Sequence, residues 1–155
     1  MKRINYEDYK RQSDYLTFGQ GDNVVRLVSD GFYGIVYKMK TKNALIKWTN
    51  WEDIPEQYRD NVEGAERWTW VAINRSTGQV GVMEVGATIG DELILKIQEK
   101  KLDPLRTDFL IHRKGEGFKT EYTIAVAPET KPFTDKEKQL IQSRRIYLLK
   151  KYIDG

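Results

Sequence analysis

Alternation between hydrophobic and polar positions dominates the middle of the chain and predicts antiparallel strands. The clearest example lies between residues 103 and 128, where two alternating stretches flank a short segment with Gly115 and Gly117. Successive side chains of a strand point to opposite faces, and glycines between two such stretches mark a tight turn. We therefore expect a hairpin here, with Tyr122 on its apolar face.

Two earlier stretches show the same alternation. Residues 23–39 read as two strands around the turn-forming residues 29–31, and residues 67–85 read as a hairpin. In this hairpin, period-two alternation puts Trp68 and Trp70 on one face, opposite a face of β-branched side chains. Four strands are therefore expected up to residue 85.

Helical spacing appears twice. Thr88 and Asp91 form a capping-box pattern in front of an apolar stripe with helical spacing. Thr134 and Glu137 form a second such pattern, in front of a segment that runs to Tyr152 and is rich in lysine and arginine. The sequence thus predicts one helix between strands and one basic helix at the C-terminus.

The order of these elements indicates the fold. It is strands, an irregular stretch from 40 to 66 with a short helix over 55–64, two strands, one helix and two further strands. A helix between the strands of a small antiparallel sheet is typical of the OB-fold, where it plugs one end of the barrel. The sequence therefore predicts a mainly β protein: an OB-fold-like five-stranded antiparallel barrel with one inter-strand helix, an inserted flap and a C-terminal helix. An SH3-like barrel or an open α+β sheet has a compatible order. The expected parts are an N-terminal arm (1–20), the barrel domain (21–128, insertion 40–66) and a linker with the basic helix (129–155).

Composition limits the function classes. The chain has 155 residues and a formal net charge of +3, with 39% hydrophobic and 32% charged residues, so a globular domain is expected. It has no cysteine, which excludes disulfides, thiolate zinc sites and cysteine nucleophiles. No apolar run approaches the length of a membrane span, and the first residues lack the apolar stretch of a signal peptide. We therefore expect a soluble, cytoplasmic protein.

Patterns for catalysis are weak. His112 is the single histidine, with no cysteine or second histidine to share a metal ion. The acidic stretch from Glu52 to Glu66 lacks the spacing of a metal-dependent nuclease site, and a solvated acidic face explains it better. The glycines of the last hairpin form no phosphate loop, because no helix follows them. We expect a protein that is not an enzyme and that holds no cofactor and no metal ion.

Basic residues interleaved with aromatic rings form the remaining pattern. Rings can stack on nucleic-acid bases, and each cation on a phosphate adds salt-dependent affinity. The rings expected to stack on bases are Tyr37, Trp51, Trp70 and Phe118, with Tyr33, Trp48 and Trp68 as second choices. The cations expected to contact phosphates are Arg26, Lys40, Lys47, Arg75, Arg113, Lys114 and Lys119.

Two motifs carry a resemblance to a known family. One is the turn Asn74-Arg75-x-Thr77-Gly78 after a Trp-bearing strand, and the other is the glycine-rich hairpin, with Asp108, Arg113, Gly115, Gly117, Thr120 and Tyr122. With these motifs, the stretch from Gly21 to Pro128 resembles the single-stranded DNA-binding proteins of tailed bacteriophages, the helix-destabilising group with an OB-fold core. Residues 40–66 match poorly.

The resemblance implies a function and partners. It implies sequence-independent binding of single-stranded DNA in phage DNA replication, recombination and repair, within the cytoplasm of the host cell. It also implies self-association on DNA and contact with replication or recombination proteins. Some members carry a Cys and His zinc site between the early strands, which this chain cannot form, and many end in an acidic tail where this chain has a basic helix. The alternatives are a protein–protein interaction module of a replication or recombination complex, binding of RNA in place of DNA, and a nuclease that uses the acidic stretch.

Overall fold

The computed structural model describes residues 1, 3–7, 13–41 and 47–153. Seven strands form one antiparallel sheet in the order β3-β2-β4-β1-β6-β7, and β5 pairs with β4 outside this path. The strands are β1 (Gly21–Leu27), β2 (Phe32–Met39), β3 (Lys47–Trp48), β4 (Val62–Asn74), β5 (Gln79–Val85), β6 (Asp108–Lys114) and β7 (Glu121–Val126). The helices are α1 (Ala87–Glu99) and α2 (Asp135–Tyr152), with short 3-10 turns at Trp51–Asp53, Glu56–Asn61, Pro104–Arg106 and Gly117–Lys119.

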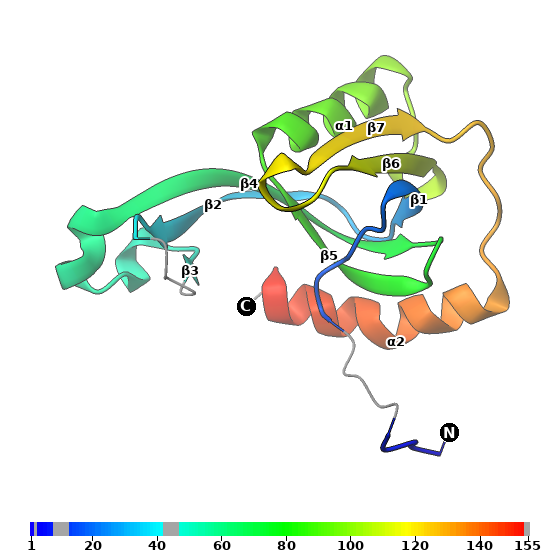
Figure 1. Cartoon of the computed structure of the whole chain (residues 1–155), viewed down its shortest axis with the longest axis horizontal. Helices are drawn as coiled ribbons and strands as arrows, with labels where there is room; N and C mark the ends of the chain where they lie inside the picture. The colour runs from blue at the N-terminus through cyan, green and yellow to red at the C-terminus, as the bar shows by residue number, and fades with distance from the viewer. Residues whose placement is uncertain (2, 8–12, 42–46, 154–155) are drawn as a thin grey trace.

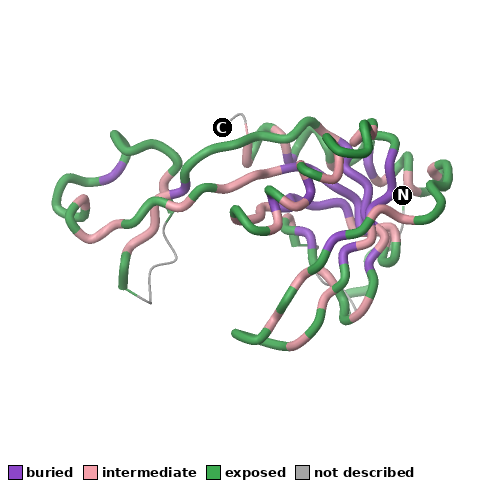
Figure 2. Tube along the Cα trace, turned by 90° about the horizontal axis from the view of Figure 1, so that it is seen from above, coloured by how far each residue is buried: buried purple, intermediate pink, exposed green. Residues whose placement is uncertain are grey.

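The long strand β4 belongs to two parts of the molecule. Its C-terminal half pairs with β1 and β5, whereas its N-terminal half pairs with β2, from Thr69 opposite Phe32 to Val62 opposite Met39. This second pair extends away from the body, together with β3 and the 3-10 turns next to it (Figures 1 and 2). We call this extension, residues 32–41 and 47–69, the ribbon. Most of the ribbon is exposed, with Val36 and Ile54 as buried exceptions, whereas most buried residues lie in the body (Figure 2).

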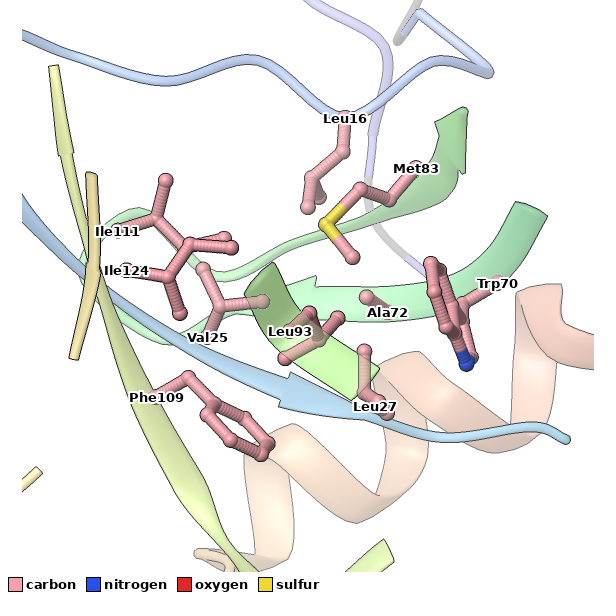
Figure 3. Close-up of a cluster of buried hydrophobic side chains, with 10 residues drawn as sticks. All are labelled: Leu16, Val25, Leu27, Trp70, Ala72, Met83, Leu93, Phe109, Ile111 and Ile124. Carbon is pink, nitrogen blue, oxygen red and sulfur yellow. The ribbon is translucent and has the colours of Figure 1, made fainter. Parts of the chain in front are cut away.

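Two hydrophobic clusters cover the two faces of the β4–β5 pair. On one face, Trp70, Ala72 and Met83 pack with side chains from β1, β6, β7 and α1 (Figure 3). On the other face, the β-branched residues of β4 and β5 pack beneath Ile141 and Leu148 of α2. We call these the inner face and the outer face. The two helices consequently lie on opposite sides of the strands (Figure 1).

The N-terminal segment, residues 13–20, lies along the free edge of β5. Leu16 donates its N–H to the carbonyl of Val82 at 2.9 Å, and Val82 donates its N–H to the carbonyl of Asp14 at 2.7 Å. The Leu16 side chain is buried in the inner cluster. This close approach requires a glycine at position 81, because a Cβ there would lie 2.7 Å from the main-chain nitrogen of Leu16.

A buried ion-pair network joins β1, β4 and β6 to the last part of the chain. Asp108 accepts from Arg26 Nε at 2.8 Å and from Arg75 Nη1 at 2.9 Å, and its side chain is only 3% exposed. Arg75 also bonds Glu137 of α2 at 2.8 Å. The guanidinium carbons of Arg26 and Arg75 lie 4.3 and 5.1 Å from the centre of the Phe133 ring. Every charge in this network therefore has an opposite partner, which is the condition for burying charge at acceptable cost.

The overall class of the fold was predicted correctly, but the strand count was wrong. The protein is mainly β, with one helix between strands and one at the C-terminus. It has seven strands where a five-stranded barrel was expected: the six predicted strand segments all form strands, β1 and β2 both pair with β4, and the expected flap contributes β3. Across the described residues the sheet is open, since β5 pairs only with β4 and meets the N-terminal segment at Tyr15.

Of the two predicted capping boxes, one is present. The Thr134–Glu137 capping box is present at α2. At α1 the predicted box is wrong, because the N-cap is Gly86 and Thr88 already lies inside the helix, so no side chain caps it. The short helix expected over 55–64 is a 3-10 turn at Glu56–Asn61, after which the chain enters β4. Residues 42–46 of the expected flap lie outside the described residues.

The Asp108 network makes a stability prediction. Asp108→Ala removes the carboxylate between two buried guanidinium groups and leaves their charges poorly compensated. We expect the free energy of unfolding to fall by about 3–5 kcal/mol, measured by urea denaturation. The control is Asp22→Ala, which breaks an exposed pair with His112 of the same 2.8 Å length. That variant should lose about 0–1 kcal/mol, and an equal loss in both variants would contradict the role assigned to the network.

Candidate nucleic-acid interface

A trough of about 450 Å³ lies where the ribbon meets the C-terminal end of α2. Its walls come from β2, β3, β4, β5, the end of α2 and the N-terminal segment, which are distant in sequence (Figure 1). The aromatic residues that line it are Tyr15, Phe32, Tyr33 and Tyr152, and the charged residues are Lys47, Arg67, Glu84 and Lys151. We use the name trough for this site from here on.

Strand register explains how these side chains meet. Residues directly opposite each other in an antiparallel pair project to the same face. Phe32 lies opposite Thr69, and Thr69 lies opposite Glu84, so the three form one row across β2, β4 and β5 on the outer face. In the next row Gly34 lies opposite Arg67. Because Gly34 has no side chain and a Cβ there would meet nothing within 4 Å, the trough stays open at this point.

The trough holds more positive than negative charge. Glu84 Oε1 lies 3.8 Å from Lys47 Nζ and 3.6 Å from Arg67 Nε. Lys38, opposite Lys47 in the register, adds a further cation on the same face. Burial lowers the pKa of Lys38, and the nearby charges of Lys47 and Arg67 lower it further. An anion bound here would relieve this repulsion, so the cations favour a ligand with negative charge.

The wall on the α2 side is held by Asp14. Its carboxylate accepts from Tyr152 Oη at 2.6 Å, from Arg144 Nη2 at 2.9 Å and from Lys151 Nζ at 3.1 Å. The hydrogen bond from Tyr152, followed by those from the two cations, holds the pKa of Asp14 well below its usual range. Next to it, Tyr15 packs edge-on against Tyr152, with ring centres 5.3 Å apart. The N-terminal segment thereby fixes the aromatic wall of the trough.

A second group of rings lies on the opposite, inner face of the ribbon. Tyr33 contacts Trp68, with ring centres 5.2 Å apart, and Tyr37 contacts Trp51 at 5.6 Å. Trp48 stacks on Tyr58 at 6.4 Å near the end of the ribbon. We call these three pairs the ring row. Tyr33 and Trp51 are 58% and 41% exposed, so the row presents aromatic surface to solvent.

The predicted site residues divide into three groups. Lys47 lines the trough, Tyr37 and Trp51 belong to the ring row, and Lys40 is exposed next to β2. A second group lies at the tip of the β6–β7 hairpin, where Phe118 is fully exposed and Arg113 donates to the carbonyl of Phe18 at 2.7 Å. Lys114 and Lys119 of this tip are exposed as well. None of the four tip residues lines the trough.

The third group is buried, which corrects the prediction of a surface role. Trp70 is 5% exposed and packs in the inner cluster beside Gly31. Arg26 and Arg75 are held by Asp108, with side chains 7% and 10% exposed. Alternation fixed which residues share a face but left open which face is covered, so buried and exposed rings looked alike.

Sequence reasoning missed most of the residues that line the trough. Arg67 and Glu84 were not singled out, nor were Phe32, Lys151 and Tyr152 as ligand contacts. A usable signal was present in β2, where a glycine interrupts a run of large residues at Gly34. A glycine inside a strand indicates either a bulge or close approach of another group.

Comparisons with known proteins identify no relative of this chain. No protein family, no curated protein and no solved structure matches the chain. Within the described residues, no group of three or more acidic or histidine side chains is placed to hold a metal ion. No helix in the described part of the chain is long and apolar enough to cross a membrane. The fold is thus a mainly β, open antiparallel sheet with a C-terminal helix, and its function is argued from the site.

Asp14 yields a prediction with a defined pH dependence. Asp14→Asn removes the charge that accepts hydrogen bonds from four α2 side chains, and we expect the free energy of unfolding at pH 7 to fall by about 1–2 kcal/mol. Because the folded pKa is lowered, this contribution is present above the unfolded pKa of about 3.9 and is lost as pH falls toward the folded value. The difference in melting temperature between the two proteins should therefore shrink below about pH 4.

Asp30, which is exposed, gives the matched control for this experiment. Asp30→Asn should leave the melting temperature within about 1 °C at every pH. A difference between wild type and Asp14→Asn that stays constant down to acid pH would show that the carboxylate charge of Asp14 is not what stabilises the wall.

Proposed function

We propose that the protein binds single-stranded DNA without strong sequence preference, through an OB-fold-like sheet and the trough beside it. The function fits the phage DNA replication, recombination and repair implied by the sequence resemblance, in the cytoplasm of the host cell. The protein would act as a binding protein and not as an enzyme. Replication or recombination proteins, and further copies of this chain on DNA, are its expected partners.

The strand order supports the OB-fold interpretation. If β1 and β2 are counted together as the first strand, then β4, β5, β6 and β7 supply the other four, and α1 falls between the third and the fourth. OB-folds bind oligonucleotides on the surface of their second and third strands, next to the loop between the first two. In this chain the corresponding surface is the outer face of β4 and β5, which α2 covers except next to the ribbon, and the corresponding loop is the end of the ribbon. The trough lies at that junction.

The observation that carries the proposal is the meeting of rings and excess positive charge in the trough. Phe32 and Tyr15 are 40% and 42% exposed, so their rings can contact a base. Lys47, Arg67 and Lys151 stand around them, with Glu84 as the single carboxylate among the described lining residues. Bases in a duplex are stacked on each other and offer no free face to such rings, whereas a single strand does. The trough therefore favours single-stranded over double-stranded nucleic acid.

The proposal predicts salt-dependent binding. With three cations on phosphates, the logarithm of the association constant for oligo-dT should fall with the logarithm of salt concentration with a slope of about −2. Fluorescence anisotropy of a labelled oligonucleotide at several salt concentrations measures this slope. In Lys47→Ala the slope should become smaller by about 0.7. Binding that ignores salt, or no binding at low salt, would contradict the proposal.

Gly34→Val tests the trough itself. The new side chain projects from the outer face of β2 into open space, and valine suits a strand, so the protein should fold normally. By obstructing the space next to Phe32, it should weaken oligo-dT binding about tenfold or more. Met39→Leu changes a residue on the inner face of the same strand that does not line the trough, and it should leave affinity unchanged. Equal affinities for wild type and Gly34→Val would show that DNA does not enter the trough.

The ring row supports a second candidate function, a protein–protein interaction module. It exposes Tyr33, Ile35 and Trp51 on the inner face, a composition found in the centre of protein interfaces. Two substitutions separate the two functions. If the ring row binds a partner protein, Trp51→Glu, in the ring row and outside the trough, disrupts that complex while Gly34→Val preserves it. If the trough binds DNA, the two substitutions have the opposite effects on oligo-dT affinity.

A further inference from the structure

Glu84 occupies an unusual position in the trough. Its side chain is 19% exposed, yet both of its ion pairs are longer than a hydrogen bond, at 3.6 Å to Arg67 and 3.8 Å to Lys47. Among the described residues no donor makes a hydrogen bond with its carboxylate. The oxygens of Glu84 are not fully buried, so they are accessible from the trough. The two cations therefore balance the charge of Glu84 while its oxygen lone pairs remain free for a ligand.

We propose that Glu84 gives the trough a preference for guanine within single-stranded DNA; this inference rests on the proposed function. A carboxylate is an acceptor with two oxygens and takes paired donors best. Guanine carries two adjacent donors, N1–H and the N2 amino group, on the edge that is free in a single strand. Thymine offers N3–H between two carbonyl oxygens, which repel a carboxylate, and cytosine and adenine each offer one amino group beside an acceptor. Guanine alone can therefore donate to both oxygens of Glu84.

The row across the sheet has a suitable geometry for this contact. Phe32, Thr69 and Glu84 are consecutive neighbours on β2, β4 and β5. Adjacent strands lie about 4.8 Å apart, so Phe32 and Glu84 are separated by roughly 10 Å along the sheet. A purine stacked on the Phe32 ring can span the small side chain of Thr69 and direct its donor edge at Glu84. Tyr15 lies on the same side of the trough, where its pKa is raised mainly by burial and next by the charge of Glu84.

The charge balance keeps this preference compatible with binding of the DNA backbone. A lone carboxylate would repel phosphates, but here Arg67 and Lys47 stand within 4 Å of it, and Lys38 adds a third cation nearby. Phosphates therefore meet net positive charge, while the carboxylate acts only on the base. We expect general affinity from the cations and a moderate base preference from Glu84.

The experiment compares two short oligo-dT strands that carry one dG or one deoxyinosine at the centre. Deoxyinosine lacks only the N2 amino group, so the pair isolates the second donor. Wild-type protein should bind the dG strand about tenfold more tightly, measured by competition against a labelled oligo-dT. In Glu84→Met, and in Glu84→Gln, whose amide has one acceptor oxygen and cannot pair with both donors side by side, the two strands should bind equally. Thermal melting of each variant confirms that it is folded.

Glu63→Met is the matched control, because Glu63 is exposed on the same face of the ribbon, opposite Lys38, and does not line the trough. It removes the same charge and should preserve the preference for dG. Equal binding of both strands by wild type, with normal affinity, overturns the inference and leaves the proposed function standing. A preference that persists in Glu84→Met also overturns it. Failure of wild type to bind either strand overturns the proposed function, and the inference with it.

Discussion

One carboxylate, that of Asp108, connects the sheet to the C-terminal segment and to α2. It faces Arg26 of β1 and Arg75 at the end of β4, and both arginines also bond the carbonyl of Lys131. Through Glu137 the same network reaches the first turn of α2. Since a buried charge without partners costs several kcal/mol, these groups stabilise each other only in the arrangement seen here. The position of α2 on the outer face depends on it.

The trough depends in turn on where α2 ends. Ile141 and Leu148 hold the helix on the outer face of β4 and β5, so its last turn comes to lie beside the base of the ribbon. Asp14 then joins this last turn to the N-terminal segment. The cations of the trough come from the ribbon and from α2, and only the packing of the body brings these two parts together. A site built this way requires the whole domain to be folded.

The sequence was sufficient for elements whose signals are local. The two hairpins, the helix between strands and the capping box at Thr134 depend on alternation, turn glycines and side chains three residues apart, all of which can be read along the chain. The separation of Trp68 and Trp70 from the β-branched face was also correct, since it needs only a period of two. At α1 a local pattern at Thr88 was outweighed, because the strand β5 ends at Val85 and the helix begins at once.

The site was much less predictable, because it depends on which face of the sheet is covered. Arg26 and Arg75 resemble surface cations in the sequence, but their partner Asp108 is 82 and 33 residues away from them. The trough combines Tyr15, Phe32 and Tyr152, which no local pattern relates. Long-range pairing, and not composition, decides which cations remain free to meet a ligand.

The edge of β5 has a consequence for the solubility of the protein. An uncovered edge strand exposes unpaired N–H and C=O groups and can pair with a strand of another molecule. Here the main chain around Leu16 occupies that edge, and it fits because residue 81 is glycine. Loss of the N-terminal segment, by proteolysis or truncation, would therefore do more than remove a wall of the trough. It would expose the unpaired backbone groups of β5 and make the domain prone to aggregation.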